Sequence, residues 1–497
     1  MPCRLGYLTS QQCKLQEESE EAAAETASMD RIYGSALATI VAATGEDANS
    51  GLRGVERKEC APTNGIPRNI EQPSAEVNGA HIITPFDCSQ NLDTTAWNSR
   101  GWTFQEKLLS RRLIVFSDNE VVWYCRRLTC REDMRDDDSG GRVPKLDWLN
   151  LKPQWFDQKK PGQVQWVDGS LEVDRFRRTH VVRSGTFAEY AKVVVQYTRR
   201  NLTHNSDILF ALEGLLNIFE QSFGSTFLCG LPESLFDIAL LWRPLQQLER
   251  RICANGSKFP SWSWSGWEGG VFYDNPLLVR RDSDGAALSY TREVSGEEGV
   301  RPLLKWYTCD IKTGELRPVN GHGRGVPVAD EKLPKEWEGD PFIEGQPAIA
   351  GPLTGQLGLP QLIFRTSSVN SLHLTGTRLP TKQPPKGHSD GGGPSSRALS
   401  PKQFSVEDAS GIIGTLTLDG KNDFRFDRDI HELVCISESH HLGAEDRDGQ
   451  IQEFQDYIVM LVERQANLGA YERLGLGAVR KRSWRSANPK IKTIVLL

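Results

Sequence analysis

The chain has 497 residues, with 59 lysines and arginines against 65 aspartates and glutamates and a net charge of −6. This balance gives no electrostatic reason to expect a nucleic-acid partner, and no basic tail suggests attachment to a membrane surface. No run of about 18 apolar residues occurs, so no transmembrane helix is expected. The N-terminus lacks the apolar core of a secretory signal. We therefore expect a cytoplasmic protein of about two to four domains.

Ten cysteines are scattered along the chain, a density too low for a disulfide scaffold, so reduced thiols are expected. Cys125 and Cys130 are the only close pair, and their spacing fits no common zinc site. Three histidines between residues 431 and 441 match no metalloprotease spacing. The sequence predicts no metal site and no bound cofactor.

The first elements can be read from apolar spacing. Residues 29–43 predict a helix followed by a short β-branched strand, Thr39-Ile-Val-Ala-Ala43, and residues 56–80 predict a loop. Residues 98–110 predict a partly helical segment capped by Asn98 or Ser99. Two apolar runs, 112–116 and 121–125, are joined by a short polar turn and predict a hairpin.

Farther along, residues 131–183 show no clear period and predict a variable connector. A helix is expected from Ser184, and a second helix is expected to be capped by Ser206 and Asp207. Residues 235–242 predict a third helix that ends near Pro244.

The C-terminal part has the pattern of a small β-rich region. Short strands are expected over 300–365, and residues 378–404 are rich in Pro, Gly, Ser and Lys, as in a flexible linker. Strands are expected at 411–418, 431–437 and 456–463, followed by a turn at residues 475–477.

The densest motif is WNSRGWTFQE at residues 97–106. Trp97 and Trp102 provide two bulky anchors, while Arg100, Gln105 and Glu106 must be hydrogen-bonded if buried or else used on a ligand. One interpretation is structural, with Arg100 and Glu106 as polar ties for the two indoles. Since positions 102 and 106 are four apart, Trp102 is expected to lie over Glu106 on a helix.

A second tryptophan motif, Trp262-Ser-Trp264-Ser-Gly-Trp267, is expected to begin as an extended segment with its first two indoles on one side. Such a surface could stack a sugar or a base. The favoured interpretation is a plug that closes the core over the preceding helices.

Several of these segments together resemble the fungal heterokaryon incompatibility (HET) domain family. The similarity lies in four ordered blocks of sequence: residues 29–54, 97–125, 259–267 and 457–477. The second block ends in a Val-x-Trp-x-Cys pattern that contains Trp123. The family's usual opening blocks, of the Ala-Leu-Ser-Tyr-x-Trp-Gly and Leu-Trp-Ile-Asp types, are missing. The resemblance therefore predicts a HET domain that is N-terminally truncated relative to the family.

The resemblance implies an incomplete α/β module, similar to TIR domains and flavodoxin-like folds, followed by a mixed α+β region with a β-rich C-terminal part. The expected organisation is a partial HET domain at 1–130, a connector at 131–183, a helical and Trp-rich region at 184–370, a linker at 371–405 and a β-rich region at 406–497.

The resemblance also implies a role in non-self recognition and programmed cell death. The chain would act as an effector or regulator through TIR-like self-association or with other incompatibility proteins, without nucleic acid or membrane. The alternative is an NAD-cleaving enzyme, by analogy with TIR domains that cleave NAD. Glu106 would then hold the ribose or stabilise an oxocarbenium-like centre, and Arg100 would bind phosphate. NAD is a substrate in this alternative.

Overall fold

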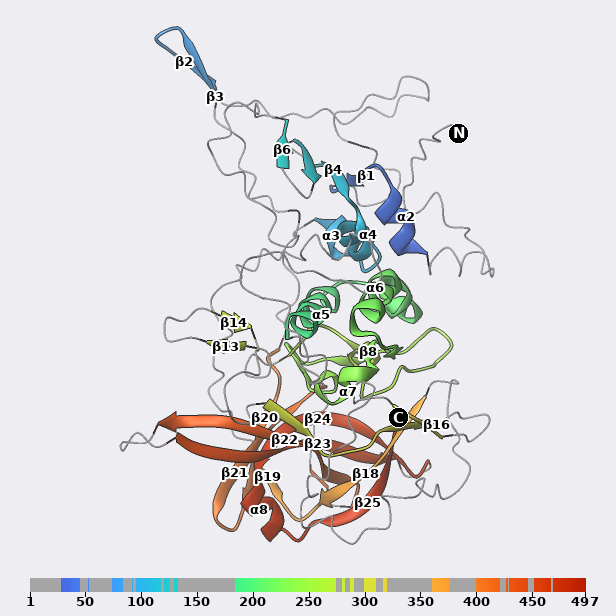
Figure 1. Ribbon diagram of the computed structural model, residues 1–497, viewed down its shortest axis with the longest axis vertical. Coiled ribbons are helices and arrows are strands. Elements are labelled where there is room, and N and C mark those ends of the chain that lie inside the picture. The colour runs from blue at the N-terminus through green and yellow to red at the C-terminus, as the bar shows by residue number, and fades with distance from the viewer. Residues whose placement is uncertain are drawn as a thin grey trace, which may run out of the picture.

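In the computed structural model, three regions are stacked along one long axis (Figure 1). A small sheet with short helices lies at one end, a helical region lies in the middle, and a large sheet lies at the other end. The residues described are 28–44, 52, 74–83, 92, 95–117, 120–125, 129–132, 184–273, 279–281, 287–289, 299–309, 316–319, 360–375, 399–420, 426–427, 429–445, 451–465 and 468–497.

The small sheet follows helix α2 (Met29–Ser35) and has the strand order β1-β4-β5-β6. Its strands are β1 (Thr39–Ala42), β4 (Arg112–Phe116), β5 (Val121–Cys125) and β6 (Thr129–Arg131). The predicted helix, strand and hairpin are confirmed, and β4 and β5 pair antiparallel. Strand β1 pairs parallel with β4, which requires a crossover connection and places this region among α/β arrangements.

One face of this sheet is its core. Val41 from β1 and Val115 from β4 are almost fully buried, together with Leu92 and Trp97 from the chain between the strands. Alternation along a strand sends successive side chains to opposite faces, so every second residue of β4 belongs to this core.

The region predicted as a loop at 56–80 contains a hairpin at its end. Strand β2 (Ser74–Val77) pairs antiparallel with β3 (Ala80–Ile83). The two turn residues, Asn78 and Gly79, have φ of 53° and 78°, as a tight two-residue hairpin turn requires. The rest of that predicted loop lies outside the described residues.

The predicted cap at Asn98 or Ser99 is wrong. The segment makes two short helices, α3 (Ala96–Ser99) and α4 (Thr103–Leu109), where a single helix start was expected. Thr95 caps α3, since its side chain accepts a hydrogen bond from the backbone of Asn98 at 3.2 Å.

The middle region contains α5 (Ser184–Tyr197), which was predicted, and α6 (Glu213–Phe223). The predicted cap of the second helix is wrong, because residues 205–212 form two 3-10 turns and α6 begins only at Glu213. Asp207 does not cap a helix; its carboxylate instead accepts a hydrogen bond from Trp102 at 3.0 Å. The third predicted helix is shorter than expected: α7 (Phe236–Ala239) ends before β9 (Trp242–Pro244).

Short two-stranded pairs complete the middle region. Paired strands are β7 (Phe227–Leu228) with β8 (Leu231–Pro232), β9 with β12 (Val271–Tyr273), β10 (Glu249–Arg250) with β11 (Trp267–Glu268), and β13 (Val279–Arg281) with β14 (Ala287–Ser289). The β9–β12 and β10–β11 pairs hold the chain segments on either side of the second tryptophan motif close together.

The large sheet contains eleven of the described strands, so the β-rich C-terminal part is confirmed. Its strands are β15 (Gly299–Pro302), β16 (Tyr307–Cys309), β17 (Leu316–Pro318), β18 (Gln361–Val369), β19 (His373–Thr375), β20 (Gln403–Asp408), β21 (Gly411–Leu418), β22 (His431–Glu445), β23 (Ile451–Gln465), β24 (Ala470–Arg480) and β25 (Lys490–Leu496), with α8 (Lys481–Ser486) before the last. Pairing runs from β18 through β22, β23, β24 and β25 back to β18, so these five strands close a ring.

Some predicted boundaries fall inside this sheet. Strands β16 to β18 come from the predicted middle region 184–370, and β19 comes from the predicted linker 371–405. The described part of that linker pairs in the sheet, while residues 376–398 lie outside the described residues. The predicted division into domains stays a prediction.

The turn predicted at residues 475–477 is wrong, because both glycines lie within β24. A Cβ atom at Gly475 or Gly477 would collide with the carbonyl oxygen of Thr417 or Thr415 in the neighbouring strand β21. These glycines therefore permit a close approach of two strands and do not reverse the chain.

A buried ion pair joins the large sheet to the middle region. Arg473 of β24 and Asp419, which follows β21, are both fully buried, and the guanidinium donates to the carboxylate at 2.8 Å. Burial raises the pKa of Asp419, and the charge of Arg473 opposes that rise. The same guanidinium donates to the carbonyl oxygens of Leu240 and Trp242 at 2.7 Å each and lies 3.7 Å from the centre of the Trp242 ring.

Replacing Arg473 by Met should destabilise the protein by about 3–5 kcal/mol, because it strands a buried carboxylate and two carbonyl groups. Urea unfolding measures the loss. The matched control is Arg480→Met on the same strand, where the arginine is exposed and a change within about 0.5 kcal/mol is expected. Equal losses for the two variants would contradict a central role of the pair.

Candidate functional site

The motif at residues 97–106 forms a tight corner between α3 and α4. The hydroxyl of Thr103 donates to the carbonyl oxygens of Trp97 and Arg100, the latter at 2.9 Å, and so closes the corner from inside. Thr103 is buried, as are all the other residues of α4. The corner is therefore a fixed part of the fold and presents its backbone in one conformation.

The two tryptophans of the corner belong to different cores. Trp97 packs in the core of the small sheet, whereas Trp102 packs against the large core that includes Phe104 and Tyr197. The indole of Trp102 points to Asp207, so the structure gives it a partner other than Glu106. One ten-residue motif thus holds the small sheet to the helical region.

A short backbone ladder fixes the corner to the end of α5. Gly101 donates to the carbonyl of Asn201, and Asn201 donates to the carbonyl of Ser99, both at 2.7 Å. A Cβ atom at position 101 would collide with the side chain of Leu202. A larger residue at position 101 would force the Leu202 side chain to move.

Two cations meet at the amide oxygen of Asn98. Lys107 donates to it at 2.9 Å, and Arg200 donates to it at 2.7 Å. The Arg200 guanidinium also lies 4.6 Å from the centre of the Phe104 ring. Positive charge is thus concentrated on the α3–α4 corner, beside the exposed side chain of Arg100.

The predicted site residues fall into different environments. Glu106 lies within α4 with only 6% of its surface exposed, while Arg100 is exposed. The ion pairs among the described residues do not include one between these two. Gln105 is buried and accepts a hydrogen bond from the backbone of Gly214 at 3.3 Å, which ties α4 to α6. The arrangement leaves Arg100 open to an anion and encloses Glu106.

Sequence reasoning did not find Asn98, Lys107, Arg200, Asn201 and Asp207 as partners in this site. A polar run, Thr-Arg-Arg-Asn, follows α5 and is the only local signal for part of this set. Since Arg200 and Asp207 lie about 100 residues from their partners in the motif, no local pattern could have paired them.

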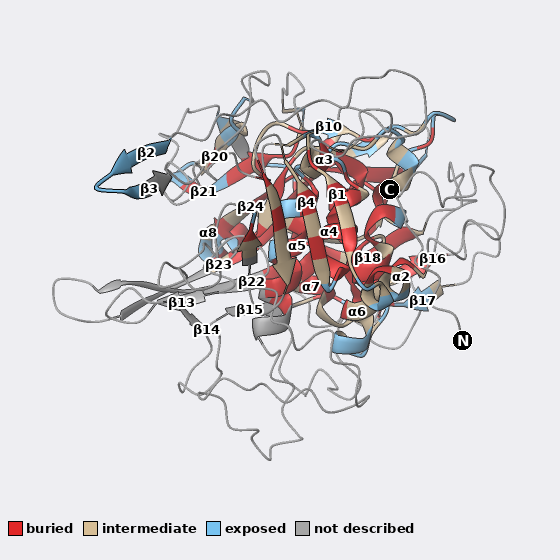
Figure 2. Ribbon diagram, turned by 90° about the horizontal axis from the view of Figure 1, so that it is seen from above, coloured by how far each residue is buried: buried red, intermediate tan, exposed pale blue. Residues whose placement is uncertain are grey.

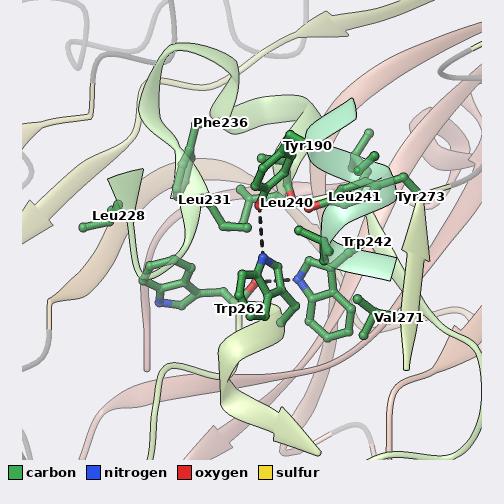
Figure 3. Close-up of a cluster of buried hydrophobic side chains, with 14 of the residues drawn as sticks. Tyr190, Leu228, Leu231, Phe236, Leu240, Leu241, Trp242, Trp262, Val271 and Tyr273 are labelled. Carbon is green, nitrogen blue, oxygen red and sulfur yellow. Dashed lines mark hydrogen bonds between the residues drawn. The ribbon is translucent and has the colours of Figure 1, made fainter. Parts of the chain in front are cut away.

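The second tryptophan motif lies in the interior of the middle region (Figure 3). Trp262 and Trp264 are fully buried, and Trp267 is 4% exposed. Residues 264–266 form a 3-10 turn, so the expected extended segment is wrong there. No face of Trp262 or Trp264 is open for stacking on a sugar or base.

Hydrogen bonds explain the serines of this motif. Trp264 donates to the hydroxyl of Tyr190 at 3.0 Å, and Tyr190 donates to the carbonyl of Gly230 at 2.7 Å. The hydroxyls of Ser263 and Ser265 both donate to the carbonyl of Cys229 at 2.6 and 3.3 Å. The motif thus holds the turn between β7 and β8, in which both central residues have positive φ.

The remaining tryptophan of the predicted set, Trp123, is half-buried on β5. In the part of the chain that the structure describes, no group of three or more His, Cys, Asp or Glu side chains is placed to hold a metal ion. None of the described helices is long and apolar enough to cross a membrane.

A comparison with known protein families found a match that includes the corner motif. Residues 10–106 match the family described as heterokaryon incompatibility protein (HET). This part of the chain is therefore similar to a HET domain. The match takes in α2, β1 and the corner motif, and it ends at Glu106 inside α4, before the β4–β5 hairpin. A HET domain implies a role in heterokaryon incompatibility.

Searches of curated proteins and of solved structures gave no match. The matched range makes up about a fifth of the chain, so the HET similarity describes the small-sheet end of the protein. The docking of that end on α5 and α6 is a feature of this structure.

Asn98→Ala should lower the free energy of unfolding by about 1–3 kcal/mol, because Lys107 and Arg200 lose a shared acceptor. Arg100→Ala in the same corner should change it by less than about 0.5 kcal/mol, since the side chain is exposed and its carbonyl remains. Thermal and urea unfolding of both variants measure this contrast. A larger loss for Arg100→Ala would show that Arg100 is a structural tie.

Proposed function

We propose that this protein acts in fungal non-self recognition, as an effector or regulator of the cell death that follows incompatible fusion. The HET match over residues 10–106 carries this proposal. The domain would work by self-association, in the manner of TIR domains. The parallel pairing of β1 with β4 is compatible with a TIR-like or flavodoxin-like module, although many α/β folds share it.

In this proposal the remainder of the chain controls the HET domain. The corner motif is hydrogen-bonded to the segment after α5 through Asn201 and to α6 through Gln105. A movement of the helical region would therefore shift the corner. The buried contacts described above would carry this coupling. The partners would be another incompatibility protein or a second copy of this chain.

An enzyme is the second candidate, because the corner places a buried carboxylate beside a positively charged surface. Glu106 would stabilise the ribose as the bond to nicotinamide breaks, water would add to the sugar carbon, and nicotinamide would leave. Arg100, whose side chain is exposed, would favour the pyrophosphate of NAD. With Glu106 6% exposed, α4 would have to move for the ribose to reach it.

Expression in a filamentous fungus tests the proposed role. The full chain under an inducible promoter should reduce colony viability at least about tenfold relative to the uninduced strain. A variant that loosens the corner, Asn98→Ala, should kill less, while Arg100→Ala should kill as well as the unchanged chain. Protein levels are compared by immunoblot. Normal growth with the full chain well expressed would contradict a death effector.

Incubation of the purified chain with NAD tests the enzyme. If it cleaves NAD, Glu106→Gln should slow release of nicotinamide by roughly 10²–10⁴-fold, because the amide keeps the shape and removes the charge. The exposed Glu76 of β2 offers a control, Glu76→Gln, which should leave the rate unchanged. Nicotinamide release that survives Glu106→Gln would remove Glu106 from the mechanism, and no release would favour self-association alone.

A further inference from the structure

Positive charge is collected at the C-terminal end of the chain. After Glu472 the sequence contains seven lysines and arginines and no aspartate or glutamate, although the whole chain has a net charge of −6. Three of these cations are buried or ion-paired within the fold: Arg473, Lys481 and Lys492. The other four are exposed and lie on or beside α8, and we call them the basic end: Arg480, Arg482, Arg485 and Lys490.

Helix α8 holds the basic end in a fixed position. Its Trp484 is fully buried and donates from the indole to the hydroxyl of Ser367 at 3.2 Å. The Trp484 ring also lies 6.2 Å from the ring of Tyr457. Arg482 and Arg485 are three positions apart and are therefore neighbours on the helix surface. Both are exposed whereas Trp484 is buried, so the outer surface of the helix carries the charge (Figure 2).

The basic end has cations without a carboxylate partner. Neither Arg482 nor Lys490 takes part in an ion pair among the described residues. Arg480 contributes least, since Asp456 lies opposite it on β23. A surface with several fixed cations attracts an anion within about a Debye length, roughly 8 Å at physiological ionic strength. The partner that this surface fits is therefore acidic.

The chain itself contains an acidic segment of matching charge. Residues 17–25 read Glu-Glu-Ser-Glu-Glu-Ala-Ala-Ala-Glu, with five carboxylates and no cation between Lys14 and Arg31. No other stretch of nine residues in the sequence has as many carboxylates without a lysine or arginine. This acidic segment lies outside the described residues and inside the range that matches the HET family. Two basic ends, or two acidic segments, would repel each other, so the charges select a contact between unlike surfaces.

The position of the two surfaces favours a contact between copies. Helix α2, which follows the acidic segment, lies at the small-sheet end, whereas α8 lies at the opposite end of the molecule (Figure 1). The acidic segment begins eleven residues before Ser28, so it reaches at most about 40 Å from Ser28 even when fully extended. The helical region and the large sheet lie between the two ends. A second copy is therefore the better source of the segment.

We propose that the basic end of one copy binds the acidic segment of a second copy, so that the chains associate head to tail. This inference rests on the proposed self-association and names its two surfaces. Since the surfaces differ, one contact leaves each copy with a free end for a further copy. Exposed ion pairs are individually weak, so the contact depends on several of them together and on local accumulation of the chain. Salt should weaken such a contact by screening.

Sedimentation velocity of the full chain tests the contact. The chain should associate as its concentration rises in about 50 mM sodium chloride and should dissociate in about 500 mM. Arg482→Glu with Lys490→Glu should weaken the association at least about tenfold. The matched control changes the net charge equally at two exposed lysines elsewhere, Lys258→Glu with Lys305→Glu, and should associate as the unchanged chain does.

Exchange of charges identifies the acidic segment. Glu20→Lys with Glu21→Lys should weaken the association about as strongly as the change at the basic end, because it removes the partner charges. A mixture of the two double variants should regain the association, since each then offers the charge that the other lacks. Recovery in the mixture requires direct contact between two copies, because misfolding of one variant would not be reversed by the other.

The outcomes separate the possible partners. A chain that stays monomeric at low salt overturns the inference. So does association that survives the change at the basic end or that the mixture fails to restore, because the basic end would then serve another anion, such as a nucleic acid or an acidic lipid surface. If the charge variants abolish association and death in the fungus persists, the surfaces are correct and self-association is not the route to death. If the chain associates as expected and never causes death, the proposed function fails while the contact stands.

Discussion

The ion pair of Arg473 with Asp419 is the interaction on which the junction of this protein depends. A guanidinium in a fully buried position must satisfy every donor it has, and here the partners come from two regions: a carboxylate from the large sheet, and the carbonyls of Leu240 and Trp242 from the helical region. Because these groups can be satisfied only together, the sheet and the helices have one relative position. The Trp242 ring covers the remaining surface of the cation.

The tryptophans then determine how the rest of the middle region packs. Trp264 and Tyr190 form a chain of hydrogen bonds to the turn at Gly230, and Trp242 donates to the carbonyl of Trp262 at 2.9 Å. Each large ring is buried with its polar atom used, except that no hydrogen-bond partner is described for the indole nitrogen of Trp262. One continuous core extends from Met29 to Leu496 as a result.

The corner at residues 97–106 makes a second junction, between the HET end and the helices. Its tryptophans are placed in two separate cores, and its glycine lets the chain lie directly against residues 201 and 202. This double anchoring explains why aromatic, glycine and polar residues are crowded into ten positions.

The sequence by itself determined the local elements whose signals are contained in one segment. The two apolar runs at 112–116 and 121–125, joined by a polar turn, indicate a hairpin, and the spacing of Phe187, Tyr190 and Val194 indicates a helix with one buried face. Motif order likewise pointed to the HET family before any geometry was known. Burial of the Trp262 motif was the favoured interpretation for the same reason: large rings are stabilised by leaving water.

Only the tertiary structure decided which distant groups satisfy one another. Asp207 was expected to cap a helix. Its carboxylate instead accepts a hydrogen bond from Trp102, and α6 begins six residues later. Gly475 and Gly477 were expected to form a turn, yet they lie within a strand. The backbone of β21 comes so close to them that no side chain would fit. Such choices depend on neighbours about 60 to 100 residues away, and a local pattern carries no information on them. The fold as a whole decides which acceptor each hydrogen-bond donor finds and which strands approach closely. The apolar pattern of the sequence only limits which elements can form.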